Sequence, residues 1–367
     1  MKLKNSERLL SLDALRGFDM FWIISGEFLV RALRDLTGWN WTVWLSIQLE
    51  HVEWNGFHFY DLIFPLFLFL SGVTMPYSLS RQLEKGIPKQ KIYIKILRRA
   101  ALLVLFGIIY NGLGDWNLTN LRYASVLGHI GVAYMFAAFI FLNTNWKQQA
   151  FWVGGILLIY WGIQMFIPVP GYGAGVLTME GSINGFVDRL LMPGKLYLEI
   201  HDPEGWLVKI SAIALALLGA QTGFFLKTNS SSQIKKVAYL ITAAVSFLVL
   251  SLIWDLFLPI NKNLWTSSFV LHAAGWSILL LSIFYFIIDV AGYKKWSFFF
   301  VVIGTNSITI YLLSSINDFS YMTKYLFGGV INWADKGMQP LLFFIFLLAI
   351  EWSLLLFLYK KKIFLKV

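Results

Sequence analysis

Two histidines and two acidic residues stand close together in the sequence, immediately ahead of a long apolar run. They are His51, Glu53, His58 and Asp61, and the run after them continues to Leu79. A histidine exchanges a proton near neutral pH, so it can serve as a general base. Ionisable groups at the mouth of a membrane span usually face a cavity, because lipid does not solvate them. We therefore predict that this cluster carries the chemistry or transport of the protein, with His51 as its main residue.

The spacing of three side chains in this cluster indicates whether they lie on one face of a helix. Trp54, His58 and Asp61 lie at i, i+4 and i+7, so they share one face if a helix already begins at Trp54. In that case the face lines a cavity, and Asp61 orients His51 or His58. The alternative is structural, with Asp61 hydrogen-bonded to a neighbouring helix and Pro65 kinking the span. The sequence leaves both open.

Other polar residues of the apolar segments form two groups. The outer group, on the same side as His51, contains Glu27, Asn261, Lys262 and Asn263. The inner or central group contains Arg16, Asn306 and Ser307. Arg16 follows Asp13 and precedes Asp19 by three residues each, a spacing that favours ion pairs within one helix. The other role open to Arg16 is to face the interior and hold a phosphate.

Several kinds of chemistry have no sequence support. The chain has no cysteine, which excludes disulfides, thiol nucleophiles and thiolate metal sites. Its histidines show neither H-x-x-H nor HExxH spacing, so we expect no metal. It also lacks a Walker loop, GxGxxG and GxSxG, which leaves ATP-driven transport and serine hydrolysis without a basis.

Composition places these residues in a membrane protein. Hydrophobic residues make up 58% of the chain and charged residues only 14%, against about 25% charged in soluble domains. We predict an all-α, polytopic integral membrane helical bundle that forms a single domain over 1–367. Asp13, Arg16 and Asp19 interrupt the first apolar run, so we expect it to be kept as a helix and not removed as a signal peptide.

Ten segments are long and apolar enough to be predicted as transmembrane helices. They are residues 10–30, 58–79, 96–113, 123–142, 150–167, 206–226, 236–258, 265–289, 296–316 and 338–359. The even number places both termini on one side. Two long connections, about 31–57 and 168–205, then lie on the opposite side, and a basic loop of about 80–95 lies on the side of the termini.

The distribution of positive charge orients this bundle. Lys and Arg number 20 in the connections on the side of the termini and nine in the other set. Positive residues stay cytoplasmic, so both termini are predicted in the cytoplasm and His51 on the extracytoplasmic side. The net charge of +10 therefore indicates topology in a plasma or inner membrane, not nucleic-acid binding. The basic loop can also attract anionic lipid or a phosphorylated ligand.

Several strings of the sequence carry a resemblance to a known family. They are RLLSLDALRG (8–17), HVEWNGFHFYDLIFPLFLFLSG (51–72), VLGHIGVAY (126–134), GFVDRLL (185–191), DPEG (202–205), PINKNLWT (259–266), TNSITIYL (305–312) and YKKKIF (359–364). In these motifs the chain resembles the heparan-α-glucosaminide N-acetyltransferase family of the transmembrane acyltransferase superfamily. The resemblance runs from residue 8 almost to the end.

The resemblance implies an activity and a donor. The family transfers an acetyl group from cytosolic acetyl-CoA to an amino sugar or glycan on the far side of a membrane, and its essential histidine matches His51. An asparagine of the family's first helix aligns with Glu27, which cannot donate the same hydrogen bond unless protonated. The chain resembles a bacterial-type member without the lysosomal enzyme's extra N-terminal luminal region.

The implied mechanism assigns roles to the remaining polar residues. The coenzyme's phosphates lie near Arg16 and the basic loop, and its pantetheine arm extends between helices toward His51. His51 acts either as general base or as a transient acetyl carrier. Candidate cofactor-binding residues are Arg16, Asn306 and Ser307. Candidates for substrate binding or catalytic support are Glu27, Asn55, His58, Asp61, Asn261, Lys262 and Asn263.

Some alternatives remain open at this stage. The turn 261–263 can supply hydrogen bonds to an oxyanion, or it can simply cap the neighbouring helices. The acceptor can be modified on nitrogen or on oxygen, and the loop 168–205 can form its site. A proton-coupled solute transporter that uses Glu27, His51 and Asp61 is the main competing function, and a non-catalytic receptor or scaffold is a third. A homodimer is possible.

Overall fold

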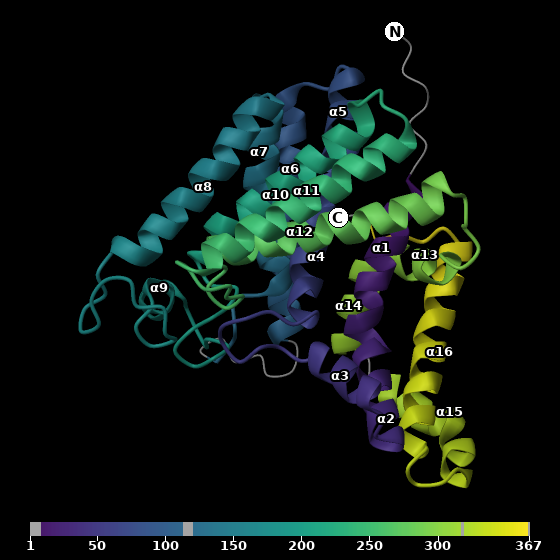
Figure 1. Cartoon of the computed structure of the whole chain (residues 1–367). Coiled ribbons are helices and arrows are strands. Elements are labelled where there is room, and N and C mark those ends of the chain that lie inside the picture. The colour runs from purple at the N-terminus through teal and green to yellow at the C-terminus, as the bar shows by residue number, and fades with distance from the viewer. Residues whose placement is uncertain (1–8, 113–119, 317–318, 366–367) are drawn as a thin grey trace.

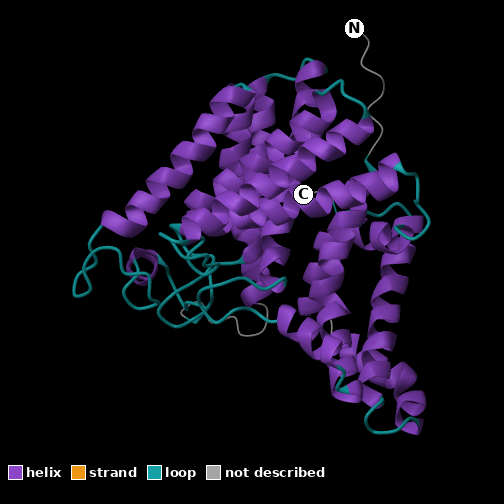
Figure 2. Cartoon of the chain, viewed as in Figure 1, coloured by secondary structure: helices purple, strands orange, loops and turns teal. Residues whose placement is uncertain are grey.

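The computed structural model describes residues 9–112, 120–316 and 319–365. Helices dominate these residues, and they contain no β-strand, only two isolated bridges, Arg122 with Gly194 and Val169 with Gly173 (Figure 2). The prediction of an all-α bundle is confirmed. The extreme N-terminal residues with Lys2, Lys4 and Arg8, and the last residues with Lys366, lie outside the described part of the chain.

The helices follow one another with short connections over most of the chain (Figure 1). They are α1 (Leu10–Phe21), the π-helix η1 (Trp22–Gly26), α2 (Glu27–Thr37), α3 (Asn40–Gln48), α4 (Tyr60–Val73), α5 (Met75–Glu84), α6 (Lys89–Gly112), α7 (Val126–Asn143), α8 (Trp146–Phe166), α9 (Ile183–Leu191), α10 (Val208–Thr228), α11 (Gln233–Asp255), α12 (Ser267–Phe284), the π-helix η2 (Tyr285–Val290), α13 (Phe298–Thr305), α14 (Ser307–Ile316), α15 (Phe319–Trp333) and α16 (Gln339–Lys360).

Each of the ten predicted spans falls on one or more of these helices. Among the described residues, seven helical segments are long and apolar enough to cross a membrane. An eighth is added if α13 and α14, which bend by 67° at their junction, count as one span. The total of ten spans therefore stays a prediction, as does the position of the termini.

The long connections contain more helix than the sequence indicated. The connection 31–57 includes the end of α2 and all of α3, and the connection 168–205 includes α9. The basic segment 80–95 is mostly helical too, because α5 continues to Glu84 and α6 begins at Lys89. The amphipathic α15 was not predicted.

Glycines allow the central helices to touch backbone to backbone. In α10, Gly219 and Gly223 pack directly against the carbonyl groups of Phe69 and Val73 in α4, and a Cβ at either glycine would lie within 2.2 Å of a carbonyl oxygen. Small residues four apart are a common device for close helix packing in membranes, where lipid provides no hydrophobic drive. This contact fixes α4, whose first turn contains Asp61.

A second close contact joins the two ends of the sequence. A Cβ on Gly17 of α1 would lie 1.7 Å from the Phe300 carbonyl oxygen in α13, and one on Gly304 would lie 1.9 Å from the Asp13 carbonyl oxygen. The bend after α13 then carries α14 back toward η1 and α6, which it contacts. The break falls at Asn306 and Ser307, where the sequence predicted one continuous span.

The loops at one end of the bundle are tied together by hydrogen bonds. The Gly56 amide donates to the Ile260 carbonyl over 2.8 Å, and Trp54 Nε1 donates to the Leu177 carbonyl over 2.8 Å. The segment with α9 lies beside these loops at the lower left of Figure 1. Residues distant in sequence thereby surround the region of His51.

Candidate functional site

A cavity of about 560 Å³ opens among these loops and extends into the helices. Its outer part is polar and includes His51, Asp61, Arg122, Glu204 and Lys262. Its inner part is lined mainly by apolar and aromatic side chains from η1, α4, α6, α7 and α14, including Ile23, Ile63, Phe67, Ile130, Ile308 and Tyr311. A polar mouth above an apolar shaft suits a ligand with a long, weakly polar arm.

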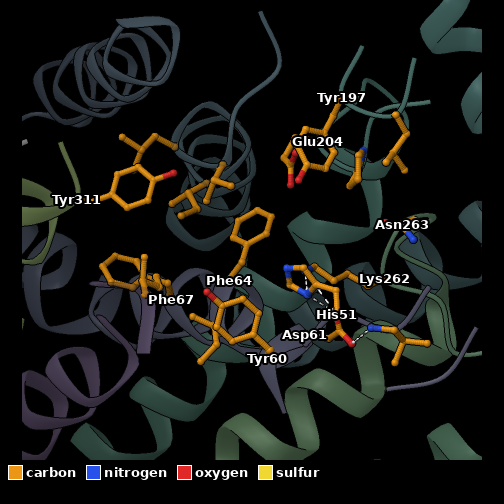
Figure 3. A pocket seen from close by; sticks show the side chains of 18 of the residues that line it. His51, Tyr60, Asp61, Phe64, Phe67, Tyr197, Glu204, Lys262, Asn263 and Tyr311 are labelled. Atoms are coloured by element: carbon orange, nitrogen blue, oxygen red, sulfur yellow. Dashed lines mark hydrogen bonds and ion pairs between the residues drawn. The ribbon is translucent and has the colours of Figure 1, made fainter. Parts of the chain in front are cut away.

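His51 and Asp61 form the central pair of the polar part (Figure 3). His51 Nδ1 lies 2.7 Å from Asp61 Oδ1, and the Asp61 side chain is only 3% exposed while that of His51 is 51% exposed. A carboxylate can only accept, so Nδ1 carries the hydrogen and Nε2 keeps a lone pair. The pair therefore fixes the tautomer in which Nε2 can act as a base.

Lys262 lies against both members of this pair. Its Nζ is 3.4 Å from Asp61 Oδ1, 3.0 Å from His51 Nδ1 and 3.2 Å from His51 Nε2. Because Nδ1 is already a donor, the ammonium can donate only to Nε2 or to the carboxylate. Burial lowers the pKa of Lys262, and the nearby carboxylates of Asp61 and Glu204 partly oppose that shift.

The loop before α4 wraps around Asp61, which corrects the prediction of a shared helical face. Asp61 Oδ2 accepts from the backbone amides of His58 at 3.1 Å and Val52 at 3.4 Å. α4 begins only at Tyr60, so Trp54 and His58 precede the helix, and Gly56 among them has a φ of +117°. The His58 ring does not line the cavity, and its Nδ1 lies 3.0 Å from the Glu50 carbonyl oxygen.

Tyr60 connects the cavity to Glu27. The Tyr60 ring lies beside His51, with centroids 4.9 Å apart, and its hydroxyl lies near Glu27. Glu27 in turn pairs with Arg31 over 2.7 Å. Glu27 therefore lies behind Tyr60 and outside the cavity wall. Its carboxylate accepts a hydrogen bond, so it does not donate one as the asparagine amide of the resembling family would.

A second charged group, centred on Arg122, forms another part of the mouth. The Arg122 guanidinium binds Asp202 in bidentate fashion, at 2.8 and 2.7 Å, and also donates to Glu204 Oε2. Burial disfavours the charge on Asp202, but Arg122 outweighs it and holds the pKa of Asp202 below its usual value. Burial raises the pKa of Glu204, because Arg122 offsets it only in part.

The asparagines of the loops mainly stabilise the turn 261–263, and most of them do not line the cavity. Asn261 is 1% exposed, donates to Asn55 Oδ1 over 3.0 Å and accepts from the Leu264 amide over 2.8 Å. These bonds give Asn261 a structural role within the turn, whereas the N-cap of α12 is Thr266. Neither Asn55 nor Asn261 is among the residues that line the cavity, whereas Asn263 is.

The predicted cofactor-binding residues lie away from the polar mouth. Arg16 is 3.7 Å from Asp13, as the ion-pair reading expected, and it stands one turn before Met20 and two before Ile23 of the cavity wall. Asn306 and Ser307 are buried at the break ahead of Ile308. None of the three lines the cavity, but Arg16 shares a helix face with residues that do.

Behind the mouth, Asp188 and His201 form a buried pair. Asp188 Oδ1 accepts from the Trp206 amide at 2.9 Å, and its Oδ2 lies 3.8 Å from His201 Nδ1. Burial raises the pKa of Asp188 to about 6 and lowers that of His201. His201 Nε2 lies 2.8 Å from the Asn263 carbonyl oxygen, so this pair supports the turn that holds Lys262.

Sequence reasoning missed several residues of the cavity, among them four polar residues of its outer part. Tyr60, Arg122, Tyr197 and Glu204 all line it. The DPEG string contained a signal for Glu204, and Arg122 stood out as a positive residue on the side poor in positive charge. Among the described residues no group of three or more His, Asp or Glu side chains could hold a metal ion.

Comparison with known proteins connects this arrangement to enzymes of a defined kind. A family described as a domain of unknown function, DUF5009, matches residues 8–171. The heparan-alpha-glucosaminide N-acetyltransferase of Mus musculus is 29% identical over 378 residues, covering 87% of this chain and 56% of its own length. The Homo sapiens protein of the same name is 27% identical over 364 residues, covering 83% of this chain and 52% of its own length.

The chain spans about half the length of the curated relatives that it matches. The matched part nevertheless covers most of this chain, and it agrees with the resemblance that the motifs around His51, the 259–266 turn and residues 305–312 indicated. Over most of its length the chain is therefore similar to the heparan-alpha-glucosaminide N-acetyltransferases of Mus musculus and Homo sapiens.

Proposed function

We propose that this protein is a membrane-bound acetyltransferase that moves an acetyl group from cytosolic acetyl-CoA to an amino sugar or glycan on the extracytoplasmic side. The observation that carries the proposal is the His51–Asp61 pair, 2.7 Å apart, at the polar mouth of a cavity with an apolar shaft. The names of the two relatives support the reaction class.

In the proposed reaction His51 is the general base. The acceptor amine loses a proton to His51 Nε2 while its nitrogen attacks the thioester carbon. Asp61 keeps Nδ1–H in place and stabilises the imidazolium that results, as the carboxylate of a catalytic triad does. The C–N bond forms, the C–S bond breaks, and the coenzyme leaves as a thiolate that takes up a proton to become the free thiol.

Lys262 is the proposed donor to the developing oxyanion. A carbonyl oxygen near His51 Nε2 is within reach of an ammonium that already lies 3.2 Å from that nitrogen. Charge-assisted donors at a partly buried position are among the most effective groups for stabilising an oxyanion. A fully deprotonated lysine could not do this, and Asp61 and Glu204 favour its charged form.

The shaft of the cavity is the proposed path of the pantetheine arm. Ile23, Ile63, Ile130 and Tyr311, from four different helices, form its walls. Arg16 stands below Met20 on the same face of α1 and is the proposed contact for the phosphates of acetyl-CoA. From Asp13 to Glu27 a helix rises about 20 Å, which covers much of an extended pantetheine arm.

The test is acetyl-CoA turnover by purified protein in detergent, with free thiol followed with and without glucosamine. We expect thiol release that depends on glucosamine and falls at least about 10³-fold in His51→Ala, since the base is lost. The matched control is His58→Gln, which changes a ring outside the cavity and leaves the backbone amide that binds Asp61.

The outcomes separate the competing functions. Turnover that His51→Ala leaves intact would exclude His51 as base. Solute flux into proteoliposomes without thiol release would establish the transporter instead. Initial rates with both substrates varied distinguish direct transfer, which gives intersecting lines, from an acetyl-imidazole on His51, which gives parallel lines.

A further inference from the structure

The charges at the polar mouth of the cavity do not cancel. Lys262 is matched by Asp61 at 3.4 Å, and Arg122 is matched by Asp202 in a bidentate pair. Glu204 then adds a further carboxylate to the wall, and Glu53 is another lining residue. With His51 neutral, these lining groups and the paired Asp202 carry an excess of negative charge.

Glu204 lies where this excess negative charge can bind a cation. It is 6% exposed, and among the described residues its side-chain hydrogen bond is to Arg122, which donates to Oε2. Its carboxylate points into the cavity toward the His51 ring on the opposite side (Figure 3). A cation in this part of the cavity shares it with the Glu204 carboxylate and the His51 ring.

Tyr197 adds a flat apolar surface next to this carboxylate. One face of its ring is covered by the Arg122 guanidinium, 4.5 Å from the ring centroid. The ring also lines the cavity and is 60% exposed. The backbone amide of Tyr197 donates to Asp202 over 3.1 Å, which holds the ring beside the Arg122 group. Aromatic rings with one open face give large contact area to a ligand at little loss of conformational freedom.

We propose that Glu204 and Tyr197 form the acceptor subsite, in which Glu204 binds the ammonium of an amino sugar and Tyr197 packs against the sugar ring. This inference rests on the proposed function and extends it to the class of acceptor, a primary amine on a pyranose. Glu204 orients the nitrogen. The bound ammonium first loses one proton to water, and the free amine then attacks the thioester while His51 takes the next proton.

The subsite favours a charged substrate over its neutral product. An ammonium stabilises the ionised form of Glu204, which burial otherwise disfavours. After acetylation the nitrogen is an uncharged amide, and the contact with Glu204 loses its ionic part. Glu204 therefore helps the product to leave, and a sugar hydroxyl gains less from it than an amine does.

The experiment compares Glu204→Gln with the unmodified chain at saturating acetyl-CoA. Gln keeps the size of the side chain and an oxygen for Arg122 but removes the charge. We expect the KM for glucosamine to rise about 10- to 100-fold, the range for loss of a hydrogen bond to a charged partner. The KM for acetyl-CoA and the inhibition constant of N-acetylglucosamine should both stay within about twofold.

Three further variants sharpen the result. Glu180→Gln is the matched control, because Glu180 is an exposed acid of the same outer segment and does not line the cavity. Tyr197→Ala should weaken glucosamine and N-acetylglucosamine alike, whereas Tyr197→Phe should bind both as before. Thermal melting of each variant confirms that it is folded.

The outcomes distinguish this inference from the proposed function. Turnover by Glu204→Gln with an unchanged KM for glucosamine overturns the subsite and leaves the acetyltransferase standing. If Glu204→Gln raises the KM for glucosamine and the inhibition constant of N-acetylglucosamine equally, the contact between Glu204 and the ammonium is overturned. Failure of the unmodified chain to release thiol with any amino sugar overturns the function and, with it, the subsite.

Discussion

At the level of single residues, the buried carboxylate of Asp61 holds the site together. It receives His51, Lys262 and two backbone amides, so four donors converge on two oxygens. A carboxylate with this many donors is fixed in position, and it fixes the ring and the lysine in turn.

Asp61→Asn tests this dependence. The amide keeps the volume but cannot hold the ring in the tautomer with a free Nε2, so we expect kcat to fall about 10²- to 10⁴-fold. Binding of acetyl-CoA, measured by calorimetry, should change little because the proposed path of the donor lies in the apolar shaft. Near-normal turnover in this variant would contradict the role given to Asp61.

The raised pKa of Asp188 predicts how the stability of the protein depends on pH. Its pKa of about 6 in the folded protein exceeds the usual value of 3.8, so the folded state binds its proton more tightly than the unfolded state does. The stability from this group is complete below about pH 4 and is lost as pH rises through about 6. The full difference corresponds to about 3 kcal/mol.

Asp188→Asn should remove that dependence. The amide oxygen can still accept from the Trp206 amide, so the fold should survive. We expect the melting temperature of the variant, relative to the unmodified chain, to increase between pH 4.5 and pH 7.5. A relative melting temperature that stays flat or decreases over this range would contradict the raised pKa of Asp188.

At the level of elements, close contacts between backbones position the walls of the cavity. Gly17 and Gly304 bring α1 and α13 together, which places Met20 and Ile23 on one wall and Ile308, after the bend, on another. The helices of a membrane bundle gain little from hydrophobic burial, so such contacts matter for their association.

Gly17→Ala should therefore destabilise the protein. Its Cβ would stand 1.7 Å from the Phe300 carbonyl oxygen, so the helices must separate. We expect a loss of about 1–3 kcal/mol or more, seen as a lower melting temperature in detergent. The matched control is Gly154→Ala in α8, where the new Cβ meets nothing within 4 Å and helix propensity favours alanine.

Another histidine shows how an apparent catalytic pair can be structural. His272 of α12 lies 2.9 Å from the Ser251 hydroxyl of α11, a distance typical of a nucleophile and its base. However, Trp276 donates to His272 Nε2, so Nδ1 carries the hydrogen and donates to Ser251. The Ser251 hydroxyl in turn donates to the Leu248 carbonyl. This chain of bonds satisfies every polar group and leaves no base for the serine.

For the whole molecule, the main open prediction is orientation in the membrane. The absence of cysteine allows a direct test, since any cysteine introduced is then the single labelled site. Ser230→Cys lies between α10 and α11 and is predicted to be cytoplasmic, whereas Tyr172→Cys lies between α8 and α9 and is predicted to be extracytoplasmic.

A membrane-impermeant maleimide should label Tyr172→Cys in intact cells and Ser230→Cys only after permeabilisation. The opposite pattern would invert the bundle and place His51 in the cytoplasm. Labelling of both positions in intact cells would contradict the predicted number of spans between them. The possible homodimer and the binding of membrane lipid remain predictions for the same membranes.

The sequence by itself determined the properties that depend on local pattern. Apolar runs of sufficient length predicted the helices, because a backbone in lipid must bond within itself. The histidines and acids between His51 and Asp61 marked the site, because such groups at the start of an apolar run need a polar partner. Where a local rule was extended too far, as in the helical face from Trp54 to Asp61, a loop closed by hydrogen bonds prevailed.

Only the tertiary structure decided which distant residues meet. His51 and Lys262 are 211 positions apart, and Arg122 and Glu204 are 82 apart, yet each pair is in contact. No periodicity of 3.6 residues links such positions. Their meeting depends on glycines that let helices touch and on buried hydrogen bonds that join three loops. The cavity, its excess negative charge and the position of Glu204 opposite His51 arise from that packing.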